Sequence, residues 1–355
     1  MALKSGEMDL FDRFGNNPII KPADVPPSRA GLTVPCVLNP GAFVYGGRIG
    51  LMLRVCEQPI PEAGYIGTCI RDPEAPGGVR IIRYRKDDPN LVQTDPRIFA
   101  YDGVTYLMSL SHLRLAWSTD GRHFEVEPRP ALEGEGIYET YGVEDCRVNE
   151  LEGEFHLTFT SVSPLGVAIG HATTTDFKNF IRHGLLFLPH NKDCVLFPRK
   201  IDGRYVAIHR PSGADVGGHF MWLSRSTDLE HWGRHHGLAM TRPGKWDGRR
   251  IGANGPPILT DRGWLQLYHG ADKNTRYCWG AMLLAHDDPT KVLARSDEPI
   301  MQPRTDYELR GFFGNVVFSN GHVVKGDELT VYYGAADEYV GGATGSIRAI
   351  LDSLK

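Results

Sequence analysis

The sequence lacks several patterns by which major protein classes are identified. No apolar run approaches the length of a transmembrane helix, and Met1–Asp9 has no apolar core of the kind found in signal peptides. A Cys-x-x-Cys pair, a His-Glu-x-x-His metal motif and a Gly-rich phosphate loop are also missing. We therefore expect a cytoplasmic protein without a membrane partner, in which six cysteines remain reduced thiols: Cys36, Cys56, Cys69, Cys146, Cys194 and Cys278.

An excess of positive charge is absent too. The chain has 39 basic and 43 acidic residues, for a formal net charge of −4. Nucleic acids and anionic membranes select strongly basic surfaces. The charge balance therefore argues against either as the main partner.

Helical periodicity is scarce. No apolar heptad persists, and the best helix candidate is the tail Ser346–Leu354. The 41 Gly and 24 Pro residues are scattered, which indicates many tight turns. These features together predict an all-β protein.

One short phrase recurs three times, in each case after an apolar, β-rich run. It reads Ser118-Thr119-Asp120 with Phe124, Thr174-Thr175-Asp176 with Phe180, and Ser226-Thr227-Asp228 with Trp232. The three Asp residues lie 56 and 52 positions apart. A turn that recurs at nearly constant spacing is typical of a radially repeated β-protein.

A second repeat consists of a glycine followed by alternating apolar residues, which predicts a strand entered from a hairpin turn. Its copies begin at Gly47, Gly103, Gly153, Gly203, Gly263 and Gly326. We expect a five-bladed β-propeller with a central active-site cavity, in which the first and last segments complete one blade together. A β-sandwich with similar turns remains the alternative.

The repeats run almost from end to end, and we therefore expect a single catalytic domain over residues 1–355. A short N-terminal extension, about 1–15, and a C-terminal tail, about 346–355, flank it.

Charged residues inside β-like segments mark the candidate site, because burying a charge without a partner is costly. Glu144 and Asp145, near Arg147, could serve in general-acid catalysis, since neighbouring carboxyl groups can acquire different pKa values. Lys192, Arg210 and Arg250 could bind an oxyanion. Taken singly, each of these is more simply interpreted as a solvated charge or a surface ion pair at a strand end.

At these segments the chain resembles glycoside hydrolase family 130, the β-mannoside phosphorylases and related β-mannosidases. The motifs that carry the resemblance keep their order along the chain: Gly142–Arg147, Asn191–Lys200, His209–Pro211, Arg250–Ala253, Gly263–Gly270, Asp288–Val292, Asn315–Phe318 and Tyr332–Asp337. The resemblance covers roughly residues 15–350 and implies a five-bladed propeller.

The resemblance also implies roles for individual residues. Asp145 is the expected catalytic acid, and the expected phosphate-binding residues are Lys192, Arg210, Arg250 and His269. Substrate contacts are expected from Asn39, Arg54, Glu144, Arg147, His209, Tyr268 and Asp337. The wording Asn191-Lys192-Asp193 is closer to members that act on β-1,2-mannosides, and Cys146 stands where the family usually has Pro.

Two enzymatic readings follow from the site composition. An inverting hydrolase needs an acid and a base, whereas an inverting phosphorylase needs an acid and fixed positive charge for phosphate. The three basic positions favour an inverting β-mannoside phosphorylase that takes a β-mannoside oligosaccharide and inorganic phosphate as co-substrates, without a metal or organic cofactor. An inverting β-1,2-mannosidase and a non-catalytic carbohydrate-binding propeller remain alternatives, and homo-oligomerisation stays open.

Overall fold

Strands make up most of the chain. The computed structural model describes residues 9–213 and 216–355, so that residues 1–8 of the predicted N-terminal extension lie outside it. Within these ranges the α-helices are two short segments, α1 (Asp306–Leu309) and α2 (Ile347–Ser353). The all-β prediction is confirmed, and α2 matches the helix predicted for the tail. No helix in the described ranges has the length and apolar character needed to cross a membrane.

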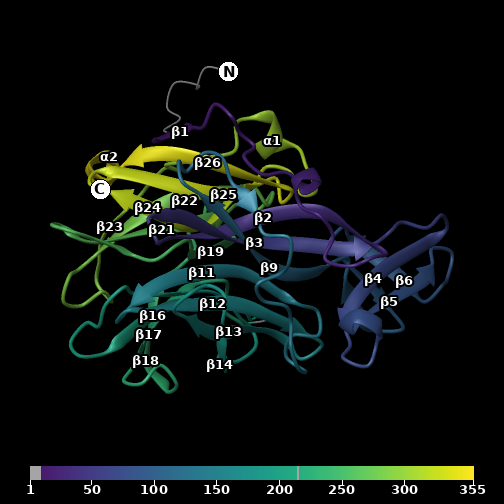
Figure 1. The fold of residues 1–355 in the computed structure, drawn as a ribbon. Helices are drawn as coiled ribbons and strands as arrows, with labels where there is room; N and C mark the ends of the chain where they lie inside the picture. Colours follow the sequence, from purple (N-terminus) through teal and green to yellow (C-terminus); the bar gives the residue numbers. More distant parts are fainter. Residues whose placement is uncertain (1–8, 214–215) are drawn as a thin grey trace.

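Five large sheets form the body of the molecule (Figure 1). The first contains β2 (Leu32–Tyr45), β3 (Arg48–Pro59), β9 (Leu110–Ser118) and β10 (Glu125–Val126). The second contains β11 (Val143–Leu151), β12 (Glu154–Ser163), β13 (Gly166–Thr174) and β14 (Ile181–Phe187). The third contains β15 (Asn191–Leu196), β16 (Tyr205–Pro211), β17 (Met221–Ser226) and β18 (Trp232–Ala239). The fourth contains β19 (Arg250–Ala253), β20 (Ile258–Thr260), β21 (Gly263–Ala271), β22 (Tyr277–Leu284) and β23 (Val292–Arg295).

The fifth large sheet joins the two ends of the described chain. It contains β24 (Val317–Lys325), β25 (Glu328–Ala335), β26 (Tyr339–Ser346) and β1 (Phe11–Arg13). Strand β1 pairs antiparallel with β26, with Phe11 opposite Gly345 (Figure 1). The predicted union of the first and last segments in one sheet is therefore observed.

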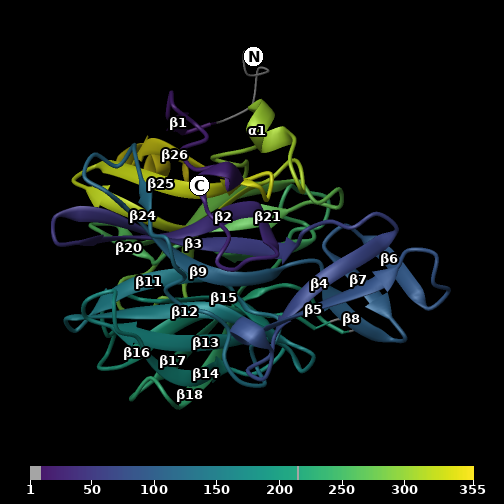
Figure 2. The ribbon, with the colours of Figure 1, turned by 45° about the vertical axis from the view of Figure 1, so that its right-hand side comes forward.

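Two small sheets project from one side of the body (Figure 2). They are inserted between β3 and β9, and contain β4 (Tyr65–Arg71) with β5 (Val79–Arg85), and β6 (Leu91–Asp95) with β7 (Ile98–Tyr101) and β8 (Val104–Leu107). Short 3-10 turns lie at Pro22–Asp24 and Pro76–Gly78. The repeat copy at Gly103 opens β8 in this insertion, so assigning it to the main repeat was wrong.

The other five glycine-led copies occupy equivalent places, because each precedes or opens the second strand of a large sheet. Each of these glycines has a positive φ, which glycine adopts without the steric penalty of a Cβ atom: Gly47 (74°), Gly153 (85°), Gly203 (68°), Gly263 (141°) and Gly326 (62°). The repeat therefore marks the hairpin turn that leads into this strand in each of the five sheets.

The Thr-Asp phrase forms the turn between the third and fourth strands of three sheets. Asp120 Oδ1 accepts hydrogen bonds from the backbone N–H groups of Arg122 (2.8 Å) and His123 (2.9 Å). The same pattern recurs at Asp176 and Asp228. A side chain that caps its own turn in this way explains why the phrase recurs at a fixed structural position.

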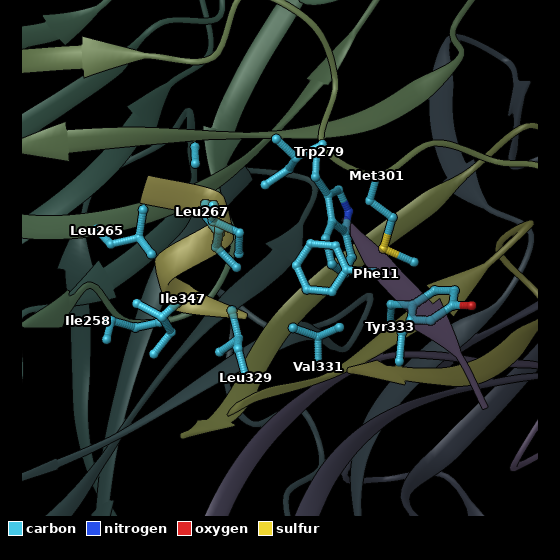
Figure 3. Packing of buried hydrophobic residues seen from close by; sticks show 14 of the residues in the cluster. Phe11, Ile258, Leu265, Leu267, Trp279, Met301, Leu329, Val331, Tyr333 and Ile347 are labelled. Carbon is cyan, nitrogen blue, oxygen red and sulfur yellow. The ribbon is translucent and has the colours of Figure 1, made fainter. Parts of the chain in front are cut away.

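Apolar side chains fill the space between neighbouring sheets. In the largest cluster, Trp279 of the fourth sheet packs edge-on against Phe11 of β1, with ring centroids 5.6 Å apart (Figure 3). Ile347 of α2 lies beside Ile258 and Leu329 in the same cluster (Figure 3). Each fully buried side chain of this size stabilises the fold by about 1.5–3 kcal/mol. Helix α2 thus covers the end of a core that two sheets share.

The first strands of neighbouring large sheets approach one another closely. A Cβ atom at Gly41 of β2 would lie 2.4 Å from the carbonyl oxygen of Cys146 in β11. Only glycine permits this separation of the two backbones. The contact brings Asn39, two residues earlier, next to the Glu144–Asp145 segment of β11.

Candidate active site

A cavity of about 380 Å³, called the main cavity below, receives residues from all five large sheets. Its volume lies within the range of small-ligand sites. Nine of the twelve predicted site residues line it: Asn39, Arg54, Glu144, Asp145, Lys192, Arg210, Arg250, His269 and Asp337. Side chains that are far apart in the sequence therefore meet at one site, as predicted.

A β-bulge presents Asp145 to the main cavity. Strand β11 has two residues, Asp145 and Cys146, between Glu144 and Arg147, whereas its partner β12 has one, Phe159, between Thr158 and Thr160. Asp145, in the bulge, has φ 51°, a left-handed conformation that Asp and Asn tolerate better than most residues. The extra residue interrupts the alternation of side chains along the strand, so that Glu144 and Asp145 both line the cavity.

A similar β-bulge occurs in the first strand of two other large sheets. Asn39 (φ 46°) lies in a bulge of β2, and Asp193 (φ 54°) lies in a bulge of β15. Three neighbouring sheets therefore present an Asx side chain at equivalent places, and this equivalence explains how the three side chains come together.

The carboxylate of Asp145 is held by two donors. Asn39 Nδ2 donates to its Oδ1 at 2.9 Å, and Arg54 Nη1 lies 3.3 Å from the same oxygen. Burial by itself raises the pKa of Asp145, but the charges of Arg54, Lys192 and Arg147 outweigh that effect and lower the pKa below the ordinary Asp value. Without other ligands in the site, Asp145 is therefore ionised at neutral pH.

Glu144 connects Arg54 to Lys192. Its Oε1 accepts from Arg54 Nη2 at 2.7 Å, and its Oε2 lies 3.3 Å from Lys192 Nζ. The Glu144 side chain is 5% exposed, so this ion pair with Arg54 is largely shielded from water. Glu144 thus fixes the positions of two cations in the cavity wall.

The three predicted phosphate-binding cations lie on adjacent strands. Lys192 and Arg210 stand directly opposite each other across β15 and β16. Arg250 opens β19, and its Nη1 donates to the hydroxyl of Tyr277 at 3.0 Å. All three line the main cavity together with Asp145, and their charge supplies a site for an anion.

Asp193 is a central carboxylate to which the sequence analysis gave no role. It lies 2.6 Å from Arg210 Nη1, 3.2 Å from His269 Nε2 and 3.3 Å from Arg147 Nη2. Burial favours its neutral form, yet the charges of these three partners hold its pKa well below the ordinary Asp value. A Cβ atom at Gly252 would lie 2.1 Å from Asp193 Oδ2, so the carboxylate also requires glycine there. The Asp-Cys pair shared by residues 145–146 and 193–194 was the available signal for this role.

Three predicted substrate-contacting residues do not line the main cavity, and their roles need correction. Arg147 is 1% exposed and donates to the carbonyl oxygens of Ala253 (2.8 Å) and Asn254 (3.1 Å). It therefore ties β11 to β19 behind the site.

His209 and Tyr268 also lie behind the cavity wall. His209 stacks on Phe187, with ring centroids 4.0 Å apart, and its Nε2 lies 2.8 Å from Ser224 Oγ. The Tyr268 hydroxyl donates to Asp247 Oδ2 at 2.9 Å. Both are packing residues that support their neighbours Arg210 and His269.

Other cavity residues received no role in the sequence analysis, although Phe318 ends the Asn315–Phe318 motif. Asp95, Arg97 and Met108 belong to or follow the small inserted sheets, while Tyr277 and Phe318 come from the fourth and fifth large sheets. Arg97 lies over the ring of Phe313, 4.4 Å from its centroid. No repeat or motif singles out Asp95, Arg97 or Met108, because their place in the wall depends on how the insertion folds back.

Asp337 is the carboxyl group in the cavity whose ionisation is disfavoured. Burial raises its pKa to about 6, and the opposing charges of Arg54 and Arg97 do not cancel that effect. Its folded-state pKa therefore exceeds the value of 3.8 for an unperturbed Asp. Ionised Asp337 costs the native state stability above pH 6, and this cost disappears as the pH falls toward 4.

We therefore expect Asp337→Asn to stabilise the protein at pH 7.5 by about 1–2 kcal/mol, since water in the cavity screens part of the effect. At pH 4.5 the difference from the wild type should shrink toward zero. Urea unfolding at both pH values measures it, and Asp102→Asn on an exposed turn is the control. An equal destabilisation at the two pH values would contradict the assignment.

Within residues 9–213 and 216–355, no group of three or more His, Cys, Asp or Glu side chains is arranged to hold a metal ion. The polar groups of the main cavity are instead paired carboxylates and cations. This donor set suits a sugar and an oxyanion.

Comparison with known proteins agrees with this geometry. A family model described as β-1,4-mannooligosaccharide phosphorylase, that of glycoside hydrolase family 130, matches residues 89–355. A β-1,2-mannobiose phosphorylase of Listeria innocua is 42% identical over 352 residues, which span 98% of this chain and 99% of that protein. A 1,2-β-oligomannan phosphorylase of a Thermoanaerobacter species is 38% identical over 237 residues, 66% of this chain and 78% of that protein.

A solved structure of the Listeria innocua β-1,2-mannobiose phosphorylase in complex with β-1,2-mannobiose superimposes with a TM-score of 0.93 at 40% identity. The match covers 97% of this chain and 99% of that chain. Both the sequence and the fold are thus shared over nearly the whole length. The chain belongs to glycoside hydrolase family 130.

Proposed function

We propose that this protein is an inverting β-mannoside phosphorylase. It cleaves a terminal β-1,2-mannosyl linkage of mannobiose or a longer oligomannoside with inorganic phosphate, and it releases α-mannose 1-phosphate and a shortened sugar. The observation that carries the proposal is the placement of Lys192, Arg210 and Arg250 in the wall of the cavity that contains Asp145. The names of the relatives that span most of the chain point to the same chemistry.

The reaction is a direct displacement. Phosphate, held by the three cations, attacks the anomeric carbon from the face opposite the leaving oxygen, so that the new C–O bond has inverted configuration. Asp145 supplies the proton that the leaving oxygen takes up as the glycosidic bond breaks. The family resemblance implies that a mannosyl hydroxyl relays this proton, and we adopt the relay for this chain.

The charge arrangement links phosphate binding to the acid. Lys192 is one of the cations that lower the pKa of Asp145. A bound phosphate anion neutralises part of that positive charge, and this raises the pKa of Asp145 toward its ordinary value. Phosphate therefore favours the protonated acid that the reaction requires.

A hydrolase would use a second carboxylate as the base that activates water. Glu144 lies between Arg54 and Lys192, and Asp193 is surrounded by Arg147, Arg210 and His269. The low pKa of Asp193 makes it a weak base. These pairings favour phosphorolysis over hydrolysis by an inverting β-1,2-mannosidase. A non-catalytic sugar-binding protein would not need the three cations.

The proposed function includes a proposed architecture. The five large sheets are the blades of a five-bladed β-propeller, which β1 closes by joining β26, and the main cavity lies at its centre. We assign residues 1–355 to this single domain, with an extension over about 1–15 and a tail over about 346–355. The two small sheets are an insertion in the first blade.

Phosphate dependence tests the proposed function directly. Cleavage of β-1,2-mannobiose should require added phosphate and release mannose 1-phosphate in the α configuration, because phosphate itself is the nucleophile. Chromatography and phosphorus NMR identify the product. Equal turnover in phosphate-free buffer, with free mannose as product, would identify a mannosidase, and binding without turnover would identify a lectin.

A further inference from the structure

Two cysteines face each other in the wall of the main cavity. Cys36 of β2 and Cys56 of β3 are directly opposite partners in the antiparallel ladder, and both line the cavity. Directly opposed residues of antiparallel strands point to the same face, with Cα atoms about 4.5–5.5 Å apart. A disulfide spans Cα atoms about 4.4–6.8 Å apart, so the backbone already has a suitable spacing.

The pair is connected to the proposed catalytic groups. Cys56 Sγ lies 3.5 Å from Ser111 Oγ, which accepts a hydrogen bond from Arg54 Nε at 3.1 Å. Arg54 in turn contacts Asp145 and Glu144. Two residues, Ser111 and Arg54, therefore connect Cys56 to the carboxylate of Asp145.

The surroundings of the two thiols shift their pKa values in opposite directions. A hydrogen bond from Cys36 and the charge of Arg54 lower the pKa of Cys56 to about 6, although burial opposes them. The same hydrogen bond, together with burial, raises the pKa of Cys36. Cys56 thus has the thiolate character of an attacking sulfur, and Cys36 stands beside it as the resolving thiol.

The remaining cysteines lack these features. All six cysteines are buried, but Cys69, Cys146, Cys194 and Cys278 do not line the main cavity, and burial raises their pKa values. All six cysteines lie in the described ranges and are free thiols in this structure. Only the pair at positions 36 and 56 combines cavity access with a neighbouring thiol.

We propose that Cys36 and Cys56 form an oxidation site for a hydroperoxide that enters through the main cavity, and that the resulting disulfide reversibly lowers phosphorolysis. The Cys56 thiolate attacks one peroxide oxygen, the O–O bond breaks, and Cys56 becomes a sulfenic acid. The Cys36 thiol then displaces that oxygen as water while the S–S bond forms. In total, two thiols and one hydrogen peroxide give one disulfide and two waters; sulfur is oxidised and peroxide oxygen is reduced.

The structure indicates why turnover falls. Forming the S–S bond draws Cys56 Sγ toward Cys36 and away from Ser111 Oγ. Ser111 then loses one of the contacts that position it against Arg54, and Arg54 holds both Glu144 and Asp145. The disulfide itself does not depend on the proposed function, whereas its effect on turnover rests on that function.

Hydrogen peroxide is the probe for the test. We treat the reduced wild-type protein, measure phosphorolysis over time, and map the cysteines by mass spectrometry without reduction. The expected result is loss of activity in step with a Cys36–Cys56 cross-linked peptide, and recovery with dithiothreitol. Saturating β-1,2-mannobiose should slow the inactivation by occupying the cavity.

Variants separate the two thiols, with each rate constant normalised to the untreated activity of the same variant. Cys56→Ser should lower the inactivation rate constant by about tenfold or more, since it removes the thiolate. Cys36→Ser should still be inactivated but recover poorly, because an unresolved sulfenic acid proceeds to sulfinic acid. Cys69→Ser should behave as the wild type.

Two results would overturn the proposal. One is full inactivation of the wild type with Cys36 and Cys56 still reduced. The other is a Cys56→Ser variant that loses activity as fast as the wild type. If the cross-link forms while the protein shows no phosphorolysis under any condition, the oxidation site stands and the proposed function fails.

Discussion

Replacing Asp145 by Asn is expected to lower kcat for phosphorolysis of β-1,2-mannobiose by about 10²–10⁴-fold, the usual contribution of a general acid. Asn has the same shape and keeps an oxygen for the donors Asn39 and Arg54, but it has no proton to deliver. The fold should therefore persist while the chemical step slows. Steady-state kinetics and the thermal midpoint measure the two effects separately.

Asp102→Asn is the matched control for this variant. Asp102 lies on an exposed turn with φ 52°, close to the φ of 51° at Asp145, so the same chemical change occurs in the same backbone conformation away from the cavity. A β-mannoside with an acidic phenol as leaving group needs little protonation, and Asp145→Asn should retain much more of its activity on that substrate. Near-wild-type turnover of mannobiose by Asp145→Asn would show that another group is the acid.

Replacing Arg250 by Met should weaken the binding of phosphate more than the binding of mannobiose. A hydrogen bond to a charged group contributes about 1.5–3 kcal/mol, which corresponds to a decrease of about 10–150-fold in kcat/KM for phosphate. No ion pair involving Arg250 occurs among the described residues; Tyr277 accepts from its guanidinium, so its removal leaves no buried carboxylate without a partner. The effect should appear mainly as a higher KM for phosphate, with a smaller change in the KM for mannobiose.

Arg249→Met provides the control for Arg250→Met. Arg249 is the preceding residue, is exposed, and does not line the main cavity. Arg249→Met should leave the KM for phosphate unchanged, because the Arg249 side chain is exposed outside the main cavity. If both variants raised KM equally, a general effect of surface charge would account for the result and Arg250 would have no specific role.

Most of the fold could be predicted because its signals are local. The Asp side chain of each Thr-Asp phrase bonds the backbone two and three residues later, and each hairpin glycine adopts a positive φ beside its own strand. Such patterns depend on neighbouring residues and survive in the sequence as repeats. The Gly103 segment was wrongly assigned to the main repeat because its hairpin has the same local sequence pattern but belongs to a different sheet.

Strand geometry explains why three of the predicted site residues do not line the cavity. His209 and Arg210 are adjacent in β16, as are Tyr268 and His269 in β21, so that only one member of each pair can face the cavity. Arg210 and His269 do so. The bulge at Asp145 breaks this alternation, which is why Glu144 and Asp145 both face inward while Arg147 lies behind them.

The amino-acid sequence alone was sufficient for the all-β class, for the hairpins, for the family and for the choice of most of the charged residues in the site. These properties depend on residue type and on spacing within a few positions. The tertiary structure was needed to show that Asp193 is shared by Arg147, Arg210 and His269, that Asp337 has a raised pKa, and that Cys36 opposes Cys56 beside the proposed catalytic groups. Each of these depends on the distance and burial of side chains from different strands, and both are set only when the sheets pack around the cavity.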